Sequence, residues 1–160
     1  MLAQFLCATV ITLAFPRAEV ACQYMQTVVE VAEENNLEPS LLIAMIRVES
    51  NWKTTAISRC RACGLTQVLA KYSKYSCRRL VRNPKLSIRE GARKLNYWIY
   101  TYGKGNVRVG LCGYNAGFRC KGKHKSKGGF RYAKKVLKHK KMIDNPPRGA
   151  FTRKLLNFVK

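Results

Sequence analysis

Apolar residues recur at helical spacing through the first third of the chain. From Val20 to Asn36 they repeat every three or four residues, so this segment is predicted to be a helix with one buried face. Pro39 suits the first turn of a second helix, and the run LLIAMIRV that follows contains one charged residue, Arg47. We expect this second helix to be central and buried.

Further helices are predicted downstream. One apolar stripe from Ile88 to Tyr102 indicates a long helix that ends at Gly103, and a shorter helix is expected over Val107–Ala116. Weaker patterns predict helices over Phe130–Met142 and Ala150–Val159. Neither a run of strand alternation nor an internal repeat is visible in the sequence. The expected fold class is therefore mainly α.

The length and composition indicate a single domain. A chain of 160 residues with 47% apolar content can bury one core and is too short for two ordinary ones. We expect residues 22–142 to form this domain and residues 143–160 to be a short basic C-terminal extension. Residues 1–21 are interpreted separately.

The N-terminal segment is an almost wholly apolar run, MLAQFLCATVITLAF, that ends at Pro16. It is shorter than the roughly 20 residues of a membrane-spanning helix and suits the core of a signal peptide. Residues 1–21 are therefore predicted to be a signal peptide or an N-terminal anchor. A buried first helix is the alternative, because no basic residue precedes the run and Glu19 disturbs the cleavage pattern. The same glutamate disfavours a lipoprotein site at Cys22.

The number of cysteines agrees with export. Removal of residues 1–21 would take Cys7 and leave six cysteines, an even number that suits disulfide bonding in an oxidising compartment. Their pairing does not follow from the sequence. The alternative is a zinc site formed by Cys60, Cys63, Cys77 and one histidine, but no second C-x-x-C motif completes a standard site. We therefore predict disulfides and no metal.

The net charge of the chain is +23, from 31 basic and 8 acidic residues. Such a field attracts polyanions through long-range attraction and counterion release. Eleven basic residues and no acid lie between Arg119 and Lys141, a segment that is either a solvated tail or a surface for an anionic polymer. Because no zinc-finger spacing or RNA-binding aromatic motif is present, we expect anionic envelope polymers as partners and no specific nucleic acid.

Acid–base chemistry has few candidates, because the chain has only eight carboxylates. Seven are expected at ordinary surface positions or in the N-terminal segment: Glu19, Glu30, Glu33, Glu34, Glu38, Glu90 and Asp144. Glu49 differs, since Leu42, Met45 and Ile46 share its helical face. Burial and the negative end of the helix dipole both raise the pKa of a carboxyl group. Glu49 is therefore the candidate general acid, although this segment alone is more typical of a glutamate that turns outward at a helix end or pairs with an arginine.

Two motifs are relevant to this candidate: the first begins with Glu49 itself, and the second lies downstream. They comprise Glu49-Ser50 with Trp52 and Ser58, the element Gly64-Leu65-Thr66-Gln67, and downstream Tyr114-Asn115-Ala116-Gly117. In this order they resemble the signature of the soluble lytic transglycosylase (SLT) domain, a relative of goose-type lysozyme. Ile88–Leu95 resembles the long helix of that family, and Tyr132 with Val136 is similar to its closing helix. The resemblance spans about Leu37 to Leu137. It implies a single lysozyme-like helical domain with a substrate cleft.

The loop before the Gly-Leu element departs from the family pattern. Arg59 and Arg61 stand where proline and glycine are usual, and a threonine replaces the methionine of the element. We expect Cys60 and Cys63 to brace this loop covalently instead. Cys112 stands where a small alanine is common, so it is either a buried free thiol or half of a disulfide.

The resemblance implies the chemistry of a peptidoglycan lytic transglycosylase. Glycoside cleavage commonly uses two carboxylates, and the motif loops carry one. Glu49 would protonate the oxygen of the β-1,4 bond between N-acetylmuramic acid (MurNAc) and N-acetylglucosamine (GlcNAc), with assistance from the muramoyl acetamido group. The same carboxylate would then take the proton of the muramoyl 6-hydroxyl, which closes 1,6-anhydro-MurNAc. Water, metal and other cofactors take no part.

The motifs imply four substrate-binding residues: Ser58, Gln67, Tyr114 and Asn115. Ser58 and Gln67 would contact the N-acetyl or sugar groups, and Asn115 would line the cleft. Tyr114 is expected to hydrogen-bond Glu49 and to orient it. The structural alternatives are a buried tyrosine and polar groups that cap loops. Trp52 is expected in the core rather than against a sugar.

Two other functions stay open. A hydrolytic muramidase on the same fold would give products without the anhydro ring, and a non-catalytic basic protein would only bind the envelope or nucleic acid. The implied partners are peptidoglycan glycan strands and, from similar short exported enzymes, a secretion or conjugation apparatus or a phage virion. The expected location is exported, periplasmic or at the cell envelope, and virion-associated for a phage enzyme.

Overall fold

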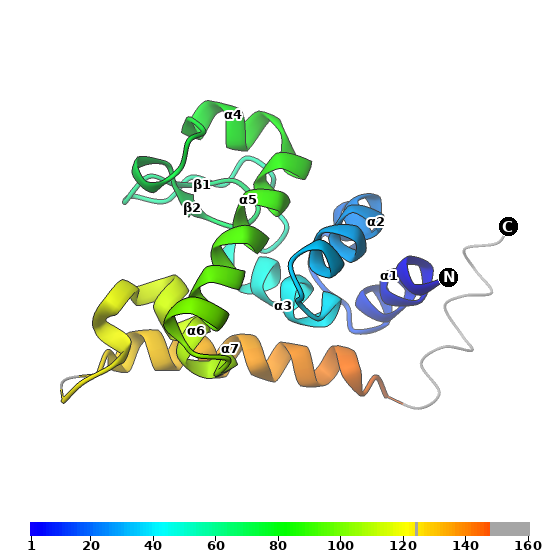
Figure 1. Cartoon of the computed structure of the whole chain (residues 1–160). Coiled ribbons are helices and arrows are strands. Elements are labelled where there is room, and N and C mark those ends of the chain that lie inside the picture. Colours follow the sequence, from blue (N-terminus) through cyan, green and yellow to red (C-terminus); the bar gives the residue numbers. More distant parts are fainter. Residues whose placement is uncertain (124, 148–160) are drawn as a thin grey trace, which may run out of the picture.

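A computed structural model describes residues 1–123 and 125–147 (Figure 1). Seven α-helices make up most of this part of the chain, joined by short 3-10 and π-helical segments and one two-stranded ribbon. The mainly α fold class is thus confirmed. The predicted helix over Ala150–Val159 and most of the predicted extension over residues 143–160 lie outside the described residues.

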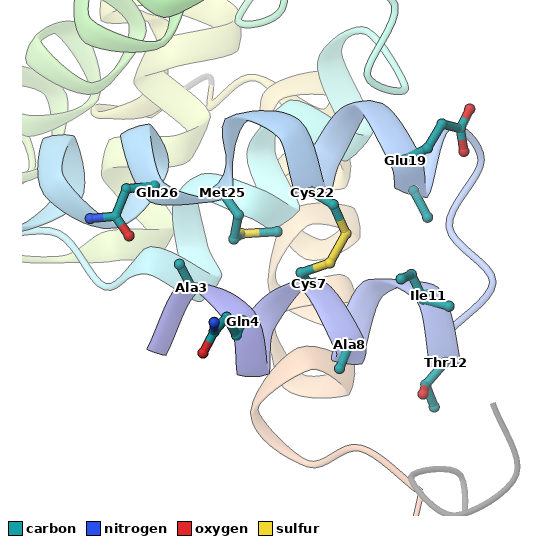
Figure 2. Close-up of a pocket in the computed structure, with 11 residues that line it drawn as sticks. Ala3, Gln4, Cys7, Ala8, Ile11, Thr12, Glu19, Cys22, Met25 and Gln26 are labelled. Carbon is teal, nitrogen blue, oxygen red and sulfur yellow. A yellow bond between two sulfur atoms is a disulfide. The ribbon is translucent and has the colours of Figure 1, made fainter. Parts of the chain in front are cut away.

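The N-terminal run forms helix α1 (Leu2–Thr12), which lies beside α2 (Ala18–Glu34). A disulfide between Cys7 and Cys22 joins the two helices (Figure 2). The apolar N-terminal run therefore packs as a helix in this structure. Cys7 forms a disulfide instead of being the one cysteine left without a partner. A signal peptide or anchor over residues 1–21 stays a prediction. Among the described residues, every helix is too short or too polar to cross a membrane.

Helix α3 (Pro39–Glu49) occupies the centre of the core. It begins at Pro39 as predicted, and every residue from Ser40 to Ile46 is buried. The helices α2 and α7 (Lys127–Asp144) pack against it (Figure 1). Because neighbours cover it on several sides, α3 tolerates apolar residues around its whole circumference.

The predicted long helix is α5 (Pro84–Asn96), which continues through the π-helical segment η2 (Tyr97–Tyr102) to Gly103. Helix α6 (Val107–Ala116) has the predicted bounds and packs on η2 and α7. After α6, a 3-10 turn, η3 (Gly117–Cys120), is closed by a disulfide between Cys112 and Cys120. Cys112 is therefore half of a disulfide rather than a free thiol.

A small second cluster lies around the loop that follows α3. The strands β1 (Ala62–Cys63) and β2 (Val68–Leu69) pair antiparallel and are followed by η1 (Ala70–Tyr72) and α4 (Cys77–Arg82). Strands of two residues are too short to show alternation, which is why the sequence pattern did not indicate them.

The disulfide of this cluster differs from the expected one. Cys63 is buried and bonds Cys77 on α4, whereas Cys60 is exposed and free. The expected brace between Cys60 and Cys63 is therefore wrong, because Cys63 points into the small apolar cluster with Val68 and Leu80. The disulfide also takes two of the sulfur ligands that the zinc alternative requires.

Candidate active site

Glu49 is the last residue of α3 and is half-buried. After Ser50, the backbone turns through two residues in the left-handed region, Asn51 (φ 54°) and Trp52 (φ 61°). The Trp52 side chain is completely buried, so it lies in the core as predicted. This turn ends the helix abruptly and leaves the carboxyl group of Glu49 at the end of an apolar helix.

The environment of Glu49 favours its protonated form. Burial raises the pKa of the carboxyl group to about 7, and a hydrogen bond from Tyr132 lowers it only in part. The Tyr132 hydroxyl donates this bond to Oε1 over 2.6 Å. A carboxyl group that both holds and releases a proton near neutral pH meets the requirement of a general acid that later acts as a base.

Tyr114 contacts a different group from the one expected. Its hydroxyl donates to the backbone carbonyl of Thr66 over 2.7 Å. The expected hydrogen bond from Tyr114 to Glu49 is therefore wrong for this structure, and Tyr132 on α7 makes that bond. Burial and the nearby charge of Glu49 raise the pKa of Tyr114 well above its usual value. Tyr114 is thus a neutral neighbour of the carboxyl group.

The role of Tyr132 was missed from the sequence. Its only signal was the similarity of Tyr132 and Val136 to the closing helix of the family, which says nothing about a partner. The contact joins residues 83 positions apart, so it depends on how α7 docks against α3. Burial and the charge of Glu49 raise the pKa of Tyr132 as well, which keeps its hydroxyl proton available for the bond.

Thr66, which stands where the family usually has methionine, ties the loop to α5. Its hydroxyl donates to the carbonyl of Ser87 over 2.7 Å, and the whole residue is buried. A Cβ atom at Gly91 would lie 2.3 Å from the Thr66 Cβ, so this close approach requires glycine on α5. Since Tyr114 bonds the carbonyl of Thr66, the threonine also fixes the position of Tyr114.

Ser58 and Gln67 both use their polar groups within the loop. The Ser58 hydroxyl accepts a bond from the Ala62 N–H over 3.0 Å. The Gln67 amide donates to the carbonyls of Ala56 and Gly64 over 3.1 and 3.0 Å. These bonds match the loop-capping alternative, so contact with a substrate stays a prediction for both residues.

A cavity of about 670 Å³ lies where β2, η1, α5, η2, α6 and η3 meet. Three of the four predicted substrate-binding residues line it, namely Gln67, Tyr114 and Asn115. Ser58 and Glu49 are not among the lining residues. Glu49 lies close enough to Tyr114 in this wall for its charge to act on the tyrosine.

One wall of this cavity is aromatic. The Trp98 ring makes edge or tilted contacts with Tyr102 and Phe118, with ring centroids 5.1 Å apart in both pairs. Gly113 lies against the same indole, and a Cβ atom there would come within 2.5 Å of it. Phe118 is 69% exposed. A partly exposed aromatic wall of this kind offers flat apolar surface to a ligand.

All charged residues that line the cavity are basic: Lys71, Arg93, Lys94 and Arg119. Arg93 and Lys94 are partly neutralised by Glu90, which lies behind them. Lys71 lies over the ring of Tyr72, and Arg119 bonds a backbone carbonyl. The cavity is therefore suited to a ligand that carries negative charge.

Glu90 is the second carboxylate that departs from a surface position. Its side chain is only 2% exposed, in contrast to the expected ordinary surface site. Burial disfavours its ionised form, but hydrogen bonds from Arg93 and Ser73 outweigh this effect and lower the pKa of Glu90. Glu90 is thus held ionised, which is the opposite of what a general acid requires.

A second cavity of the same volume lies between α1 and α2 (Figure 2), and Glu49 is not among the residues that line it. Its lining is mostly apolar, and the Cys7–Cys22 disulfide crosses it. The carboxylate at its edge, Glu19, points away from the disulfide (Figure 2). This cavity therefore offers no arrangement for acid–base chemistry.

Comparisons with known proteins agree with the fold and the motifs. The chain is similar to the X-ray structure of lytic transglycosylase Slt from Pseudomonas aeruginosa, an inactive mutant in which glutamine replaces a glutamate, with a TM-score of 0.65 and 23% identity. The similarity covers 85% of this chain and 26% of that one, so the chain spans about a quarter of its length. Curated protein sequences gave no match. The model of the transglycosylase SLT domain matches residues 26–137, and the chain therefore belongs to the transglycosylase SLT domain family.

Proposed function

We propose that this protein is a peptidoglycan lytic transglycosylase in which Glu49 is the only acid–base residue. It would cleave the β-1,4 bond from MurNAc to GlcNAc and release a glycan that ends in 1,6-anhydro-MurNAc. The observation that carries the proposal is the pKa of the Glu49 carboxyl group, which burial raises to about 7. This carboxyl group accepts a hydrogen bond from Tyr132 and interacts with Tyr114, which lines the cavity.

The remaining carboxylates support the choice of Glu49. Glu90 is ionised and held by Arg93. Glu34 pairs with Arg89, while Glu38 and Asp144 share Lys140. The other three, Glu19, Glu30 and Glu33, belong to α2, and none of them lines the cavity. A mechanism that needs one carboxylate fits this distribution better than one that needs two.

The proposed reaction proceeds in two proton transfers. Protonated Glu49 donates its proton to the glycosidic oxygen, the bond from that oxygen to C1 of MurNAc breaks, and GlcNAc leaves with a free 4-hydroxyl. The acetamido oxygen of MurNAc bonds to C1 in its place. The Glu49 carboxylate then takes the proton of the 6-hydroxyl while that oxygen displaces the acetamido oxygen at C1. Glu49 ends protonated, and no water is consumed.

Tyr132 has a positioning role in this scheme. Its hydroxyl donates to the Glu49 carboxylate, so it stabilises the ionised form that exists after the first proton transfer. It also fixes the direction of the carboxyl group, since the tyrosine is anchored in α7. Tyr114 would face the substrate from the wall of the cavity, as a neutral group whose hydroxyl donates to the Thr66 carbonyl.

The substrate class fits the cavity. Aromatic side chains stack on sugar rings, and the basic lining complements the carboxylates of the peptides that peptidoglycan carries. Gln67 and Asn115 would bind sugar or N-acetyl groups in this cavity, and Ser58 would act from the adjacent loop. The disulfides agree with an extracytoplasmic or periplasmic location.

Mass analysis of peptidoglycan digests tests the proposal. The wild-type protein should release fragments that carry the 1,6-anhydro ring and are each one water lighter than the hydrolysed fragments. Glu49→Gln should release almost none, since glutamine cannot donate the proton. Hydrolysed fragments from the wild type would identify a muramidase instead. Wall lysis that survives Glu49→Gln would remove Glu49 from the mechanism.

A further inference from the structure

Helix α7 presents two different faces. Its inner face packs on α3 and α6 and carries Tyr132 to Glu49. Its outer face carries exposed basic residues: Lys127, Arg131, Lys134, Lys135, Lys138 and Lys141. At about 100° per residue, these six positions fall within an arc of about 120°, and they extend over about 21 Å of the helix. We call this set the cationic face of α7.

The charge of the cationic face is not neutralised within the described chain. The acid on α7, Asp144, pairs with Lys140, which lies outside the arc and also bonds Glu38. None of the six basic residues of the face forms an ion pair with any described carboxylate. Six like charges along one helix side repel one another, so an external anionic partner would stabilise this arrangement.

We propose that the cationic face of α7 binds an anionic phospholipid surface. The basic residues lie on the exposed surface of a helix rather than in a groove, so all six side chains can contact a flat membrane surface at the same time. Clusters of four to eight basic residues bind anionic bilayers, with each basic residue near the surface contributing about 1 kcal/mol, or about a fivefold change in affinity.

The side chains around the face favour a membrane over nucleic acid. Single-stranded nucleic acid binds where exposed aromatic rings stack on its bases. The aromatic residues of α7, Phe130 and Tyr132, are not among the exposed ones, and the large apolar residue exposed on this helix is Met142. Met142 projects within the same arc as the basic residues, where it can enter the headgroup region.

The neighbouring helix adds apolar surface. α1 packs against α7, and Figure 1 shows it beside the C-terminal half of that helix. No charged side chain occurs before Arg17, and Leu2 is 51% exposed. A basic patch combined with a second, apolar contact is the arrangement that holds peripheral proteins stably on membranes.

Vesicle cosedimentation of the full chain tests this proposal. Wild-type protein should bind vesicles of phosphatidylglycerol mixed with phosphatidylcholine, should ignore vesicles of phosphatidylcholine alone, and should be released by added salt. Lys134→Gln/Lys138→Gln/Lys141→Gln should reduce the affinity by about 100-fold, from about fivefold per residue. These side chains are exposed, so unchanged thermal unfolding would show that the variant folds.

A matched control removes the same charge elsewhere. Arg78→Gln/Arg82→Gln/Lys85→Gln changes three exposed basic residues at α4 and the start of α5, and should keep vesicle binding within a few-fold of the wild type. Equal losses in both variants would mean that net charge alone binds, and would overturn the proposal. It would also be overturned if the α7 variant lost binding to duplex DNA but kept vesicle binding. The readout is independent of glycan cleavage, so it does not depend on the proposed function.

Discussion

The Tyr132 hydroxyl lies 2.6 Å from Oε1 of Glu49, although 83 positions separate the two residues in the chain. The bond links the end of the central helix α3 to the last described helix, α7. Among the described residues, Tyr132 is the side chain that hydrogen-bonds the carboxyl group of the proposed acid. The geometry of the acid therefore depends on the docking of α7 as much as on α3 itself.

Replacement of Tyr132 by phenylalanine should shift the pH dependence of lysis. The hydrogen bond lowers the pKa of Glu49, so its loss should raise that pKa and move the alkaline limb of the pH–rate profile to higher pH. A hydrogen bond to a charged group contributes about 1.5–3 kcal/mol, so kcat/KM should fall by about 10-fold or more.

Tyr114→Phe provides the control for this experiment. Tyr114 bonds Thr66 rather than Glu49, so its loss should lower the rate without the same shift of the alkaline limb. Identical profiles for Tyr132→Phe and the wild type would show that the bond does not tune the acid.

Glu49 should make the wild-type fold less stable as the pH rises. Its folded pKa is raised from 4.5 to about 7, so the stability that the protonated group contributes is present below pH 4.5 and is lost as the pH rises to about 7. Glu49→Gln removes this dependence. In urea unfolding, the wild type should lose about 2.5 kcal/mol of unfolding free energy relative to the variant between pH 5 and pH 8. A constant difference would contradict the raised pKa.

The disulfide between Cys63 and Cys77 should stabilise the segment between them, which contains Gln67. It closes a loop with a sequence separation of 14 residues, for which about 3 kcal/mol is typical. Cys63→Ser/Cys77→Ser should therefore lower the free energy of unfolding by about that amount. Cys60→Ser should change it by less than about 0.5 kcal/mol, because Cys60 is exposed and free. Peptide mapping that finds Cys60 bonded to Cys63 would contradict the assignment.

Gly91→Ala should destabilise the contact between α5 and the loop at Thr66. The new methyl group would clash with the buried Thr66 side chain, which costs about 1–3 kcal/mol by overpacking. A Cβ atom at Gly128, also in a helix, would make only an ordinary contact with the Ser126 hydroxyl at 4.0 Å, so Gly128→Ala should be neutral or stabilise by up to about 1 kcal/mol. Thermal unfolding of the two variants compares them directly. Equal melting temperatures would mean that the loop yields without cost.

The sequence predicts those parts of the fold that depend on local periodicity. Pro39 and the apolar run after it define α3, and the bounds of α6 were predicted to the residue. Glu49 could be singled out because it follows an apolar face in a chain with few acids. The strands β1 and β2 could not be predicted, since two residues carry no period.

What the sequence missed depends on tertiary contacts. Two tyrosines could have served Glu49, and only the docking of α7 selects Tyr132. Cys60 and Cys63 are adjacent enough to suggest a pair, but the packing of β1 turns Cys63 toward α4. Glu90 was expected at the surface because a carboxylate near the start of a helix is ordinarily solvated, whereas Ser73 from a distant loop hydrogen-bonds it.

The three disulfides have a consequence for refolding. All are local, with sequence separations of 15, 14 and 8 residues, and they use every cysteine except Cys60. No disulfide links α3 to α7, so urea can separate Glu49 from Tyr132 while all three disulfides stay intact. Loss and recovery of the site should therefore be reversible without thiol exchange, and an oxidised, denatured chain already holds the correct pairing when it starts to refold.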